Sequence, residues 1–282
     1  MRKNRFVPSL AYENKKFLES GDARPLRILA EYLEPITRLR KFRIKDTVVF
    51  YGSARALPME EAQEKYSEII SREGFNPEGN EMDRIALQEA KSMIRLAEYY
   101  EAARDLARRL TQWSMSLENG QRFIICSGGG PGMMEAANRG AMEAGGLSIG
   151  MNITIPHEQF PNPYITPELG FEFHYFFMRK FWFMYLAKAL VVMPGGFGTM
   201  DELFEVLTLI QTDRIQKVIP IVLFGSDYWK DVLHFQKFAE WGTISTKDLN
   251  LFVIVDTVDE AMQYLTTELE KRFLGKRKYW YL

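Results

Sequence analysis

A glycine-rich turn followed by a hydroxyl and two carboxylates is the stretch of the sequence best suited to chemistry. Residues 191–206 are VVMPGGFGTMDELFEV, in which an apolar run leads into Gly195, Gly196 and Gly198 and then Thr199. Backbone N–H groups that are exposed at the start of a helix attract anions. The turn is therefore suited to wrapping a phosphate, with Thr199 beginning the helix and donating its hydroxyl. No Lys precedes Thr199 and the spacing differs from that of a Walker loop, which excludes that motif.

Glu202 has two interpretations from its spacing alone. Residues 199–202, TMDE, have the pattern of a capping box, in which Glu202 would only cap the backbone at Thr199. Alternatively, a carboxylate one turn beyond a phosphate-binding loop is positioned where the ribose of a nucleotide would lie. The spacing leaves both interpretations open.

A second glycine turn, CSGGGPGMMEAANRGA, occupies residues 126–141. Flexible glycines followed by the start of a helix predict a loop that binds an anion. Pro131 fits the first position of that helix, and Gly132 allows a ligand to approach closely. The residues that free the backbone are Gly128, Gly129 and Gly130. The dinucleotide fingerprint fails because Met133 stands where its third glycine belongs, and no acid follows the next strand. A phosphate loop of another type fits better than an NAD site, and a tight structural turn is the alternative.

Two further segments carry polar groups that could contact a ligand. In FYGSAR, residues 50–55, Ser53 offers a hydroxyl and Arg55 a guanidinium that could bind phosphate through two hydrogen bonds. In HYFFMRKFWFMY, residues 174–185, Arg179 and Lys180 emerge from an aromatic segment, so Arg179 is a candidate substrate contact. The aromatic residues there are interpreted as core or base-stacking residues: Phe177, Trp182, Phe183 and Tyr185.

Six short apolar runs predict the strands that position these turns. They are apolar on both faces, as strands buried on both sides must be, and helix-period segments separate most of them. The runs occupy residues 47–52, 122–127, 147–153, 189–194, 218–224 and 251–256. The alternation predicts an α/β fold, a Rossmann-like open parallel sheet with helices on both faces. Ligands bind at the carboxyl ends of such strands, where the three glycine-bearing turns converge.

Several segments lie outside this alternation. Residues 1–45 are expected to form a helical extension, with a helix over residues 23–42 in which Pro25 occupies the first turn and Pro35 lies near the end. Residues 58–98 are expected to be a helical insertion after the first strand, with two helices before the second strand, the second over residues 82–116. The catalytic domain is expected over residues 46–275, with a last helix over residues 257–273, and residues 276–282 form a basic aromatic tail.

Composition limits the class of protein. The chain has 282 residues, 46% hydrophobic and 26% charged, which is typical of a globular enzyme. One cysteine, Cys126, cannot form an internal disulfide and is expected to be a buried strand residue in a cytoplasmic protein. No run approaches the length of a membrane helix. Three dispersed histidines provide no metal-ligand spacing, so neither a metal nor a cofactor is expected.

Charge is distributed unevenly along the chain. Residues 1–45 contain twelve Lys or Arg against five Asp or Glu, although the whole chain has a net charge of -1. A solvated or subunit-packing arm explains this surplus better than a nucleic-acid contact, and nucleic-acid binding by this arm and the basic tail is the less favoured alternative.

The motifs PGGFGTMDE (residues 194–202), MRK (178–180) and GGGPGMMEAAN (128–138) together resemble the LONELY GUY (LOG) family, long mislabelled as lysine decarboxylases. The resemblance covers the first strand and about residues 99–224. Short members of the family often carry a His just before the arginine-lysine pair, where this chain has FFMRK. GGGPGMMEAAN and PHEQFPNPYI (residues 156–165) look more like the longer bacterial branch, which resembles general nucleotide nucleosidases. The lysine decarboxylase name does not fit, because the chain offers no setting for a lysine that holds pyridoxal phosphate.

The resemblance implies a phosphoribohydrolase that cleaves nucleoside 5'-monophosphates, such as AMP or cytokinin nucleotides, to free base and ribose 5-phosphate. It implies that Arg179 and Glu202 are the catalytic pair, that the first glycine loop helps to bind the phosphate, and that the protein forms a homodimer or dimer-based assembly. Further nucleotide contacts would be Lys180, Gly195, Gly196, Gly198 and Thr199. The alternative function is a nucleotide or molybdenum-cofactor-type carrier that binds without hydrolysis.

Overall fold

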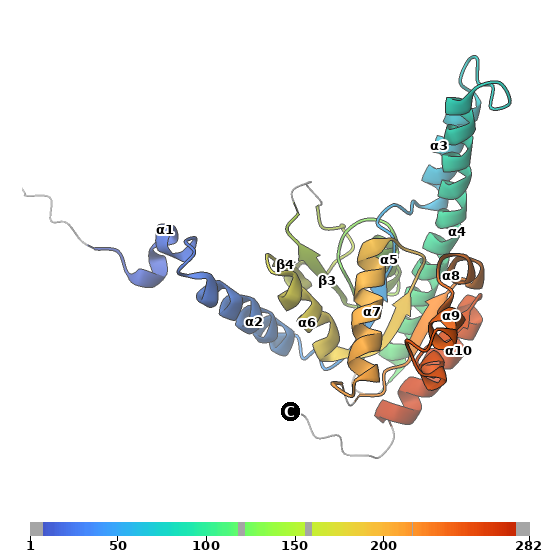
Figure 1. Cartoon of the computed structure of the whole chain (residues 1–282). Helices are drawn as coiled ribbons and strands as arrows, with labels where there is room; N and C mark the ends of the chain where they lie inside the picture. The colour runs from blue at the N-terminus through green and yellow to red at the C-terminus, as the bar shows by residue number, and fades with distance from the viewer. Residues whose placement is uncertain (1–7, 118–121, 156–159, 216, 275–282) are drawn as a thin grey trace, which may run out of the picture.

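The computed structural model describes residues 8–117, 122–155, 160–215 and 217–274. The expected aromatic tail, residues 276–282, lies outside these ranges. Within them, seven parallel strands form one open sheet with helices on both faces (Figure 1). The strands are β1 (Thr47–Tyr51), β2 (Ile124–Ser127), β3 (Ser148–Ile153), β4 (Gly170–Phe173), β5 (Ala187–Val192), β6 (Ile221–Phe224) and β7 (Val253–Val255). The predicted fold class is confirmed.

The order of the strands creates a point where the chain changes direction across the sheet. The order is β4-β3-β2-β1-β5-β6-β7, so the chain builds outward from β1 on one side and then returns to place β5 against its other edge. All six pairings are parallel. In such sheets the crevice outside the carboxyl ends of the two strands at the reversal is the preferred ligand position. Here that crevice lies above β1 and β5.

Strand β4 was missed by the sequence prediction, which expected six strands. Its sequence, GFEF, is short and alternates buried Phe171 and Phe173 with exposed Glu172. It lies at the edge of the sheet and pairs only with β3. An edge strand that is wetted on one face lacks the continuous apolar run by which the other six strands were found.

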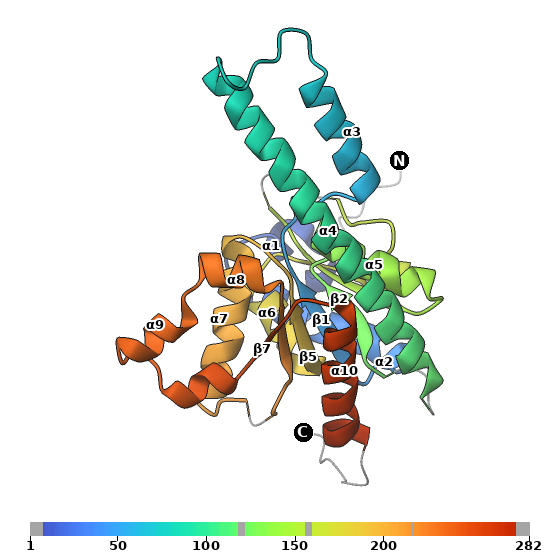
Figure 2. The ribbon, with the colours of Figure 1, turned by 90° about the vertical axis from the view of Figure 1, so that its right-hand side faces the viewer.

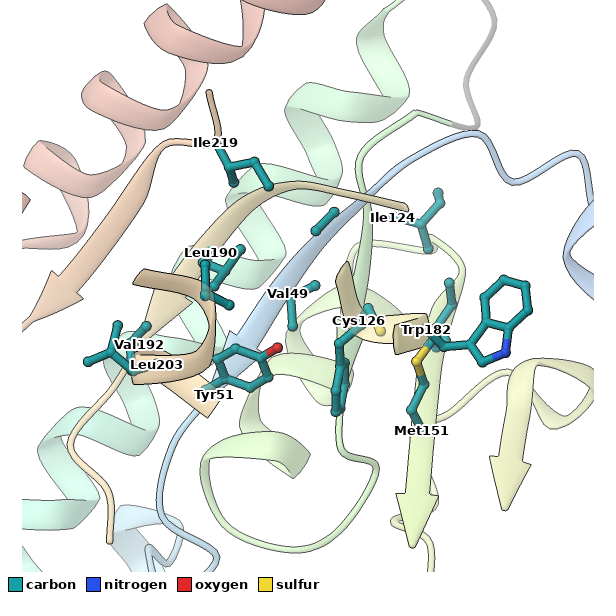
Figure 3. Packing of buried hydrophobic residues seen from close by; sticks show 14 of the residues in the cluster. Val49, Tyr51, Ile124, Cys126, Met151, Trp182, Leu190, Val192, Leu203 and Ile219 are labelled. Carbon is teal, nitrogen blue, oxygen red and sulfur yellow. The ribbon is translucent and has the colours of Figure 1, made fainter. Parts of the chain in front are cut away.

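Alternate residues of each strand enter two hydrophobic layers. Val48 and Phe50 face the layer covered by α4, α5 and α10, whereas Val49 and Tyr51 face the layer covered by α2, α6, α7 and α8. Figure 3 shows buried residues of this second layer, among them Val49 and Tyr51 of β1 and Leu203 of α7. The helices are α2 (Arg24–Lys41), α4 (Glu81–Ser116), α5 (Met133–Glu143), α6 (Phe176–Leu186), α7 (Phe197–Gln211), α8 (Ser226–Val232) and α10 (Val258–Leu269).

The predicted helical extensions form. Helix α2 begins with Pro25 in its first turn and ends at Lys41, as expected, and it continues through buried Pro35 for six residues before its end. Helix α4 matches the predicted range within one residue. The predicted last helix is α10, capped by Thr257 and followed by a short π-helical turn over Glu270–Leu274.

Two segments project from the sheet and its helices. Helix α2, with α1 (Lys15–Leu18) before it, extends to one side, while α3 (Met59–Ile70) and the first half of α4 form a hairpin on another side (Figures 1 and 2). Helix α4 has 36 residues and is therefore about 54 Å long. Its second half packs on the sheet through buried residues such as Tyr100 and Leu106.

The smaller elements complete the chain without approaching the length of a membrane span. They are three 3-10 turns, Ala11–Glu13, Pro167–Leu169 and Thr246–Asn250, and the short helix α9, Phe235–Glu240. Across the described ranges, no helix is both long enough and apolar enough to cross a bilayer.

Candidate active site

Backbone hydrogen bonds hold the three glycine-bearing turns together at the carboxyl edge of the sheet. The Ser53 N–H donates to the Pro194 carbonyl at 3.0 Å, and the Met133 N–H donates to the Ser53 carbonyl at 2.9 Å. The turns after β1, β2 and β5 are therefore in direct contact, as their positions after parallel strands predict.

Helix α7 begins two residues earlier than expected, which removes the capping interpretation of Glu202. Its first residue is Phe197 and its N-cap is Gly196, with no side-chain cap hydrogen bond, so Thr199 lies inside the helix rather than at its start. The Glu202 carboxylate instead accepts a hydrogen bond from Arg179, with Nη2 and Oε1 2.9 Å apart. Of the two interpretations that the spacing left open, the capping box is excluded because Gly196, and not Thr199, is the N-cap residue.

Arg179 and Glu202 form a shielded ion pair between α6 and α7. Their side chains are only 13% and 12% exposed. The guanidinium carbon of Arg179 lies 5.4 Å from the ring centre of Phe176 and 5.5 Å from that of Phe183. Cations are attracted to ring faces at such separations. The pair and the rings fix the direction of the guanidinium.

The surroundings of Glu202 change its acidity. Burial raises the pKa of its carboxyl group to about 7, although the charge of Arg179 acts in the opposite direction. Burial first, and the neighbouring Glu202 second, also raise the pKa of Tyr51 and of Cys126 on the adjacent strands. A carboxyl group with a pKa near 7 can exist in either protonation state at neutral pH, which suits acid-base or electrostatic catalysis.

Lys180 has carboxylate partners of its own. Its ammonium lies 2.8 Å from Asp201 and 3.0 Å from Glu205, both on α7. Burial alone would lower the pKa of Lys180, but the hydrogen bonds to these carboxylates outweigh it and the pKa is raised. The ion pairs of Lys180 thus link α6 to α7. A nucleotide that contacts Lys180, as expected from the sequence, would share the ammonium with these two carboxylates.

A buried polar network supports the glycine loop after β2. The Asn162 side-chain amide donates to the carbonyls of Gly129 and Gly130, each at 3.0 Å, and to the Asn138 side chain at 2.9 Å. Asn138 also accepts a hydrogen bond from the Ser127 hydroxyl at 2.6 Å. The sequence analysis assigned no role to Asn138 or Asn162. The signal available was an Asn within the GMMEAAN motif and another in the segment after the third strand.

Two glycines of this loop are required by packing. Gly129 and Gly132 have φ angles of +75° and +72°, which few other residues tolerate. A Cβ at Gly132 would lie 2.3 Å from the Ser53 carbonyl oxygen, so its missing side chain makes room for the neighbouring turn. At Gly128 a Cβ would lie 4.0 Å from Arg179 Nη1, which places this loop beside the ion pair.

The loop before α7 contains both packed and open positions. A Cβ at Gly195 would collide with buried Thr199, whereas a Cβ at Gly196 or Gly198 would meet nothing within 4 Å. The open glycines lie at the start of a helix of 15 residues, where unpaired N–H groups attract anions. Nearby, the Ser53 hydroxyl accepts a hydrogen bond from the Arg55 N–H at 3.1 Å, and the Arg55 side chain is exposed. This edge is therefore the accessible side of the site.

No metal-binding cluster accompanies these residues: in the part of the chain that the structure describes, no three or more His, Cys, Asp or Glu side chains gather in a suitable arrangement. The prediction that the three histidines lie apart falls partly outside the described residues, because His157 is not among them.

Comparison with known proteins identifies the family. The model of the family described as "possible lysine decarboxylase" matches residues 134–265, which include the Arg179–Glu202 pair. The chain belongs to the LOG, or lysine decarboxylase-like, family. The family expected from the sequence motifs is confirmed.

Two curated relatives carry phosphoribohydrolase names. A probable cytokinin riboside 5'-monophosphate phosphoribohydrolase of Oryza sativa subsp. japonica is 29% identical over 172 residues, covering 58% of this chain and 68% of the relative. A cytokinin riboside 5'-monophosphate phosphoribohydrolase of Arabidopsis thaliana is 28% identical over 189 residues, covering 64% and 81%. This LOG-family chain is thus a distant homologue of such enzymes.

Among solved structures, the molybdenum cofactor binding protein of Rippkaea orientalis is 18% identical, with a TM-score of 0.43, and the match covers 60% of this chain and 86% of that one.

Proposed function

We propose that this LOG-family protein hydrolyses the N-glycosidic bond of a nucleoside 5'-monophosphate, an AMP-like or cytokinin nucleotide, to free base and ribose 5-phosphate. The observation that carries the proposal is the shielded Arg179–Glu202 pair, with the carboxyl pKa at about 7, placed beside three glycine-bearing turns at the reversal of the sheet. The names of the distant relatives support the same reaction.

The phosphate of the nucleotide would bind at the open turns. The space around Gly196 and Gly198 is open, and the turn that carries half-buried Ser53 and exposed Arg55 is bonded to the same loop through Pro194. A phosphate held there is remote from the bond that breaks. Its binding energy can therefore be used to position the ribose against the ion pair.

The carboxylate of Glu202 would act at the ribose. When the bond between C1' and the base nitrogen breaks, the electron pair leaves with the base and positive charge develops on the sugar ring. A fixed carboxylate stabilises this charge, and it can orient the water that attacks C1'. The water loses a proton as the base nitrogen gains one, so base and ribose 5-phosphate are the balanced products. Arg179 would orient the nucleotide and assist the departure of the base.

The lysine decarboxylase name of the family model is not a better description of this site. A pyridoxal-dependent enzyme requires a lysine that is free to form a Schiff base with the cofactor. Lys180, which is adjacent to Arg179, is held by Asp201 and Glu205, and its raised pKa favours the unreactive ammonium. Lys180 therefore does not offer the free amine that pyridoxal phosphate requires.

A homodimer remains part of the proposal. Helix α2 exposes Leu26, Leu29 and Leu33 along one side. An open groove of about 510 Å³ runs along α2 and reaches Met178, next to Arg179. Exposed apolar residues at helical spacing are typical of a subunit interface. The second copy would lie close to the site.

Incubation of the purified protein with AMP, GMP, CMP, UMP and a cytokinin nucleotide, followed by chromatography of the free bases, tests the reaction and ranks its substrates. The proposal expects base release from at least one nucleotide, lost in Glu202→Gln. Tight binding of a nucleotide without any base release would contradict hydrolysis and favour the carrier alternative.

A further inference from the structure

Helix α6 presents a stripe of one cation and two aromatic rings to the candidate site. Phe176, Arg179 and Phe183 are spaced three and four residues apart, so they lie on one face of the helix. Both rings flank the guanidinium, at 5.4 and 5.5 Å. The two rings nevertheless lie in different environments. Phe183 is 1% exposed and belongs to the core, whereas Phe176 is 52% exposed.

The position of Phe176 places its open ring on the accessible side of the ion pair. Both α6 and α7 begin at the carboxyl edge of the sheet, because α6 follows β4 and α7 follows β5. Phe176 is the first residue of α6, three residues before Arg179, and is therefore about 4.5 Å nearer that edge along the helix axis. A ligand that reaches Arg179 from this edge would pass the ring.

The exposed ring of Phe176 lies beside a cation that is fixed in place, and a bound ligand that covers the ring would explain this arrangement. An exposed phenylalanine forgoes the free energy that burial of its ring would provide. The guanidinium carbon of Arg179 lies over the Phe176 ring, 5.4 Å from its centre, and the guanidinium is itself held by Glu202. This arrangement fixes a flat apolar surface that a planar aromatic group can cover. In a nucleotide whose ribose lies at Glu202, the base is the aromatic group adjacent to that ribose.

We propose that Phe176 is the stacking platform for the base of the nucleotide and contributes to its specificity. The inference rests on the proposed function in assuming a nucleotide ligand. The sequence left the other aromatic residues of this segment open as core or base-stacking residues. The structure buries Trp182 and Phe183 and leaves Phe176 as the exposed ring beside Arg179. Stacking on an aromatic ring is tolerant of base identity and favours larger rings, so purine nucleotides should bind more tightly than pyrimidine nucleotides.

The adjacent residue provides a matched control. Phe177 is 51% exposed on the same helix, but its ring packs 5.5 Å from Tyr175 and it does not belong to the stripe that contains Arg179. Substitution of either residue by alanine removes a similar amount of exposed apolar surface. Only the loss of Phe176 should alter recognition of a base.

The test measures the affinities of AMP and ribose 5-phosphate by calorimetry in a Glu202→Gln background, which prevents turnover. Adding Phe176→Ala should weaken AMP binding by about 5- to 100-fold while changing ribose 5-phosphate binding less than about 2-fold, because only AMP carries a base. Phe176→Trp should restore AMP binding, and Phe177→Ala should leave both affinities unchanged.

Equal weakening of both ligands, no change in either, or no binding of AMP to the parent protein would overturn the proposal. So would a change of oligomeric state in Phe176→Ala, since the ring would then be a subunit contact. The result is separable from the proposed reaction. Base release by the wild-type chain without a Phe176 effect would leave hydrolysis standing, and a Phe176 effect without base release would leave the platform standing.

Discussion

Arg179 Nη2 and Glu202 Oε1 lie 2.9 Å apart although the two residues are separated by 23 positions in the chain. Arg179 lies on α6, which precedes β5 in the chain, and Glu202 lies on α7, which follows it. The surrounding protein shields both side chains. A buried ion pair is weak evidence for stability, because the desolvation of two charges offsets their attraction. The proposed catalytic role accounts for its position beside the open glycine turns.

Glu202→Gln should abolish the fast reaction while leaving nucleotide affinity within a few fold. The amide retains the shape and the hydrogen-bond acceptor for Arg179 but not the charge, so transition-state stabilisation should fall by at least about 100-fold. Single-turnover kinetics with AMP and equilibrium binding measure the two effects. Asp201→Asn, on the same helix and more exposed, is the control and should keep most of the rate; full activity in Glu202→Gln would refute the assigned role.

Arg179→Ala should reduce both the rate and the affinity for nucleotide. The substitution removes a guanidinium positioned by Glu202 and by the ring of Phe176, and leaves a buried carboxylate without its cation. Arg179→Lys should restore only part of the activity, since an ammonium lacks the planar fork of donors. Steady-state kinetics and thermal unfolding are measured together, and a purely thermal defect would contradict the role.

Activity should rise with pH through about 7. Burial raises the pKa of Glu202 to about 7, and the proposed mechanism uses its carboxylate form. The profile of kcat/KM against pH for the wild-type chain tests this. A rate that falls as pH rises through this range would assign the reaction to the protonated acid.

Stability should change in the opposite direction over the same range. A raised pKa in the fold favours the protonated group, so its stabilising contribution is present below the ordinary pKa of a glutamate and is lost as pH rises through 7. The Tm of the wild-type chain should therefore fall relative to that of Glu202→Gln between pH 5 and pH 8. Parallel Tm curves for the two proteins would show that Glu202 does not titrate abnormally.

Asn162→Ala should lower both stability and nucleotide affinity. The substitution leaves the Gly130 carbonyl without its side-chain donor and removes one of the two donors to the Gly129 carbonyl and to the Asn138 side chain, which costs about 1–3 kcal/mol. Urea unfolding and AMP titration measure the two losses. Asn76→Ala removes an asparagine from the exposed loop between α3 and α4 and should leave AMP affinity intact; equal effects of the two variants on affinity would remove the supporting role of Asn162.

Leu29→Glu should weaken the proposed dimer. The substitution places a charge on the exposed apolar side of α2, which a subunit contact would bury without compensation. Sedimentation velocity of the wild-type and variant proteins reports the change. Met82→Glu, at an exposed position at the start of α4, is the control. A wild-type chain that sediments as a monomer would contradict the assembly.

The sequence predicted the elements whose signals are local and continuous. Six strands carried the continuous apolar runs that are typical of a sheet with helices on both faces. The three glycine turns follow three of those strands. Parallel topology then brings the turns to one edge regardless of the lengths of the intervening segments. The position of Arg179 did not follow from this topology, because β4, the strand before its helix, was not predicted; only the family resemblance paired Arg179 with Glu202.

Other features depend on tertiary contacts that no short pattern records. The start of α7 at Phe197 depends on how Gly195 packs against Thr199, and a shift of two residues changes the meaning of Glu202. Asn162 supports a glycine loop more than thirty positions away. Strand β4 is defined by its pairing with β3 and carries little apolar signal of its own.

The most direct measurement of the central claim is the quantification of both products after incubation of the protein with AMP. The account predicts that adenine and ribose 5-phosphate appear in equal amounts with the wild-type chain, and that neither appears with Glu202→Gln, although that variant still binds AMP. Equal product formation by the two proteins would contradict the role of Glu202, and AMP bound but recovered intact from the wild-type chain, with the other four nucleotides also intact, would contradict the proposed hydrolysis.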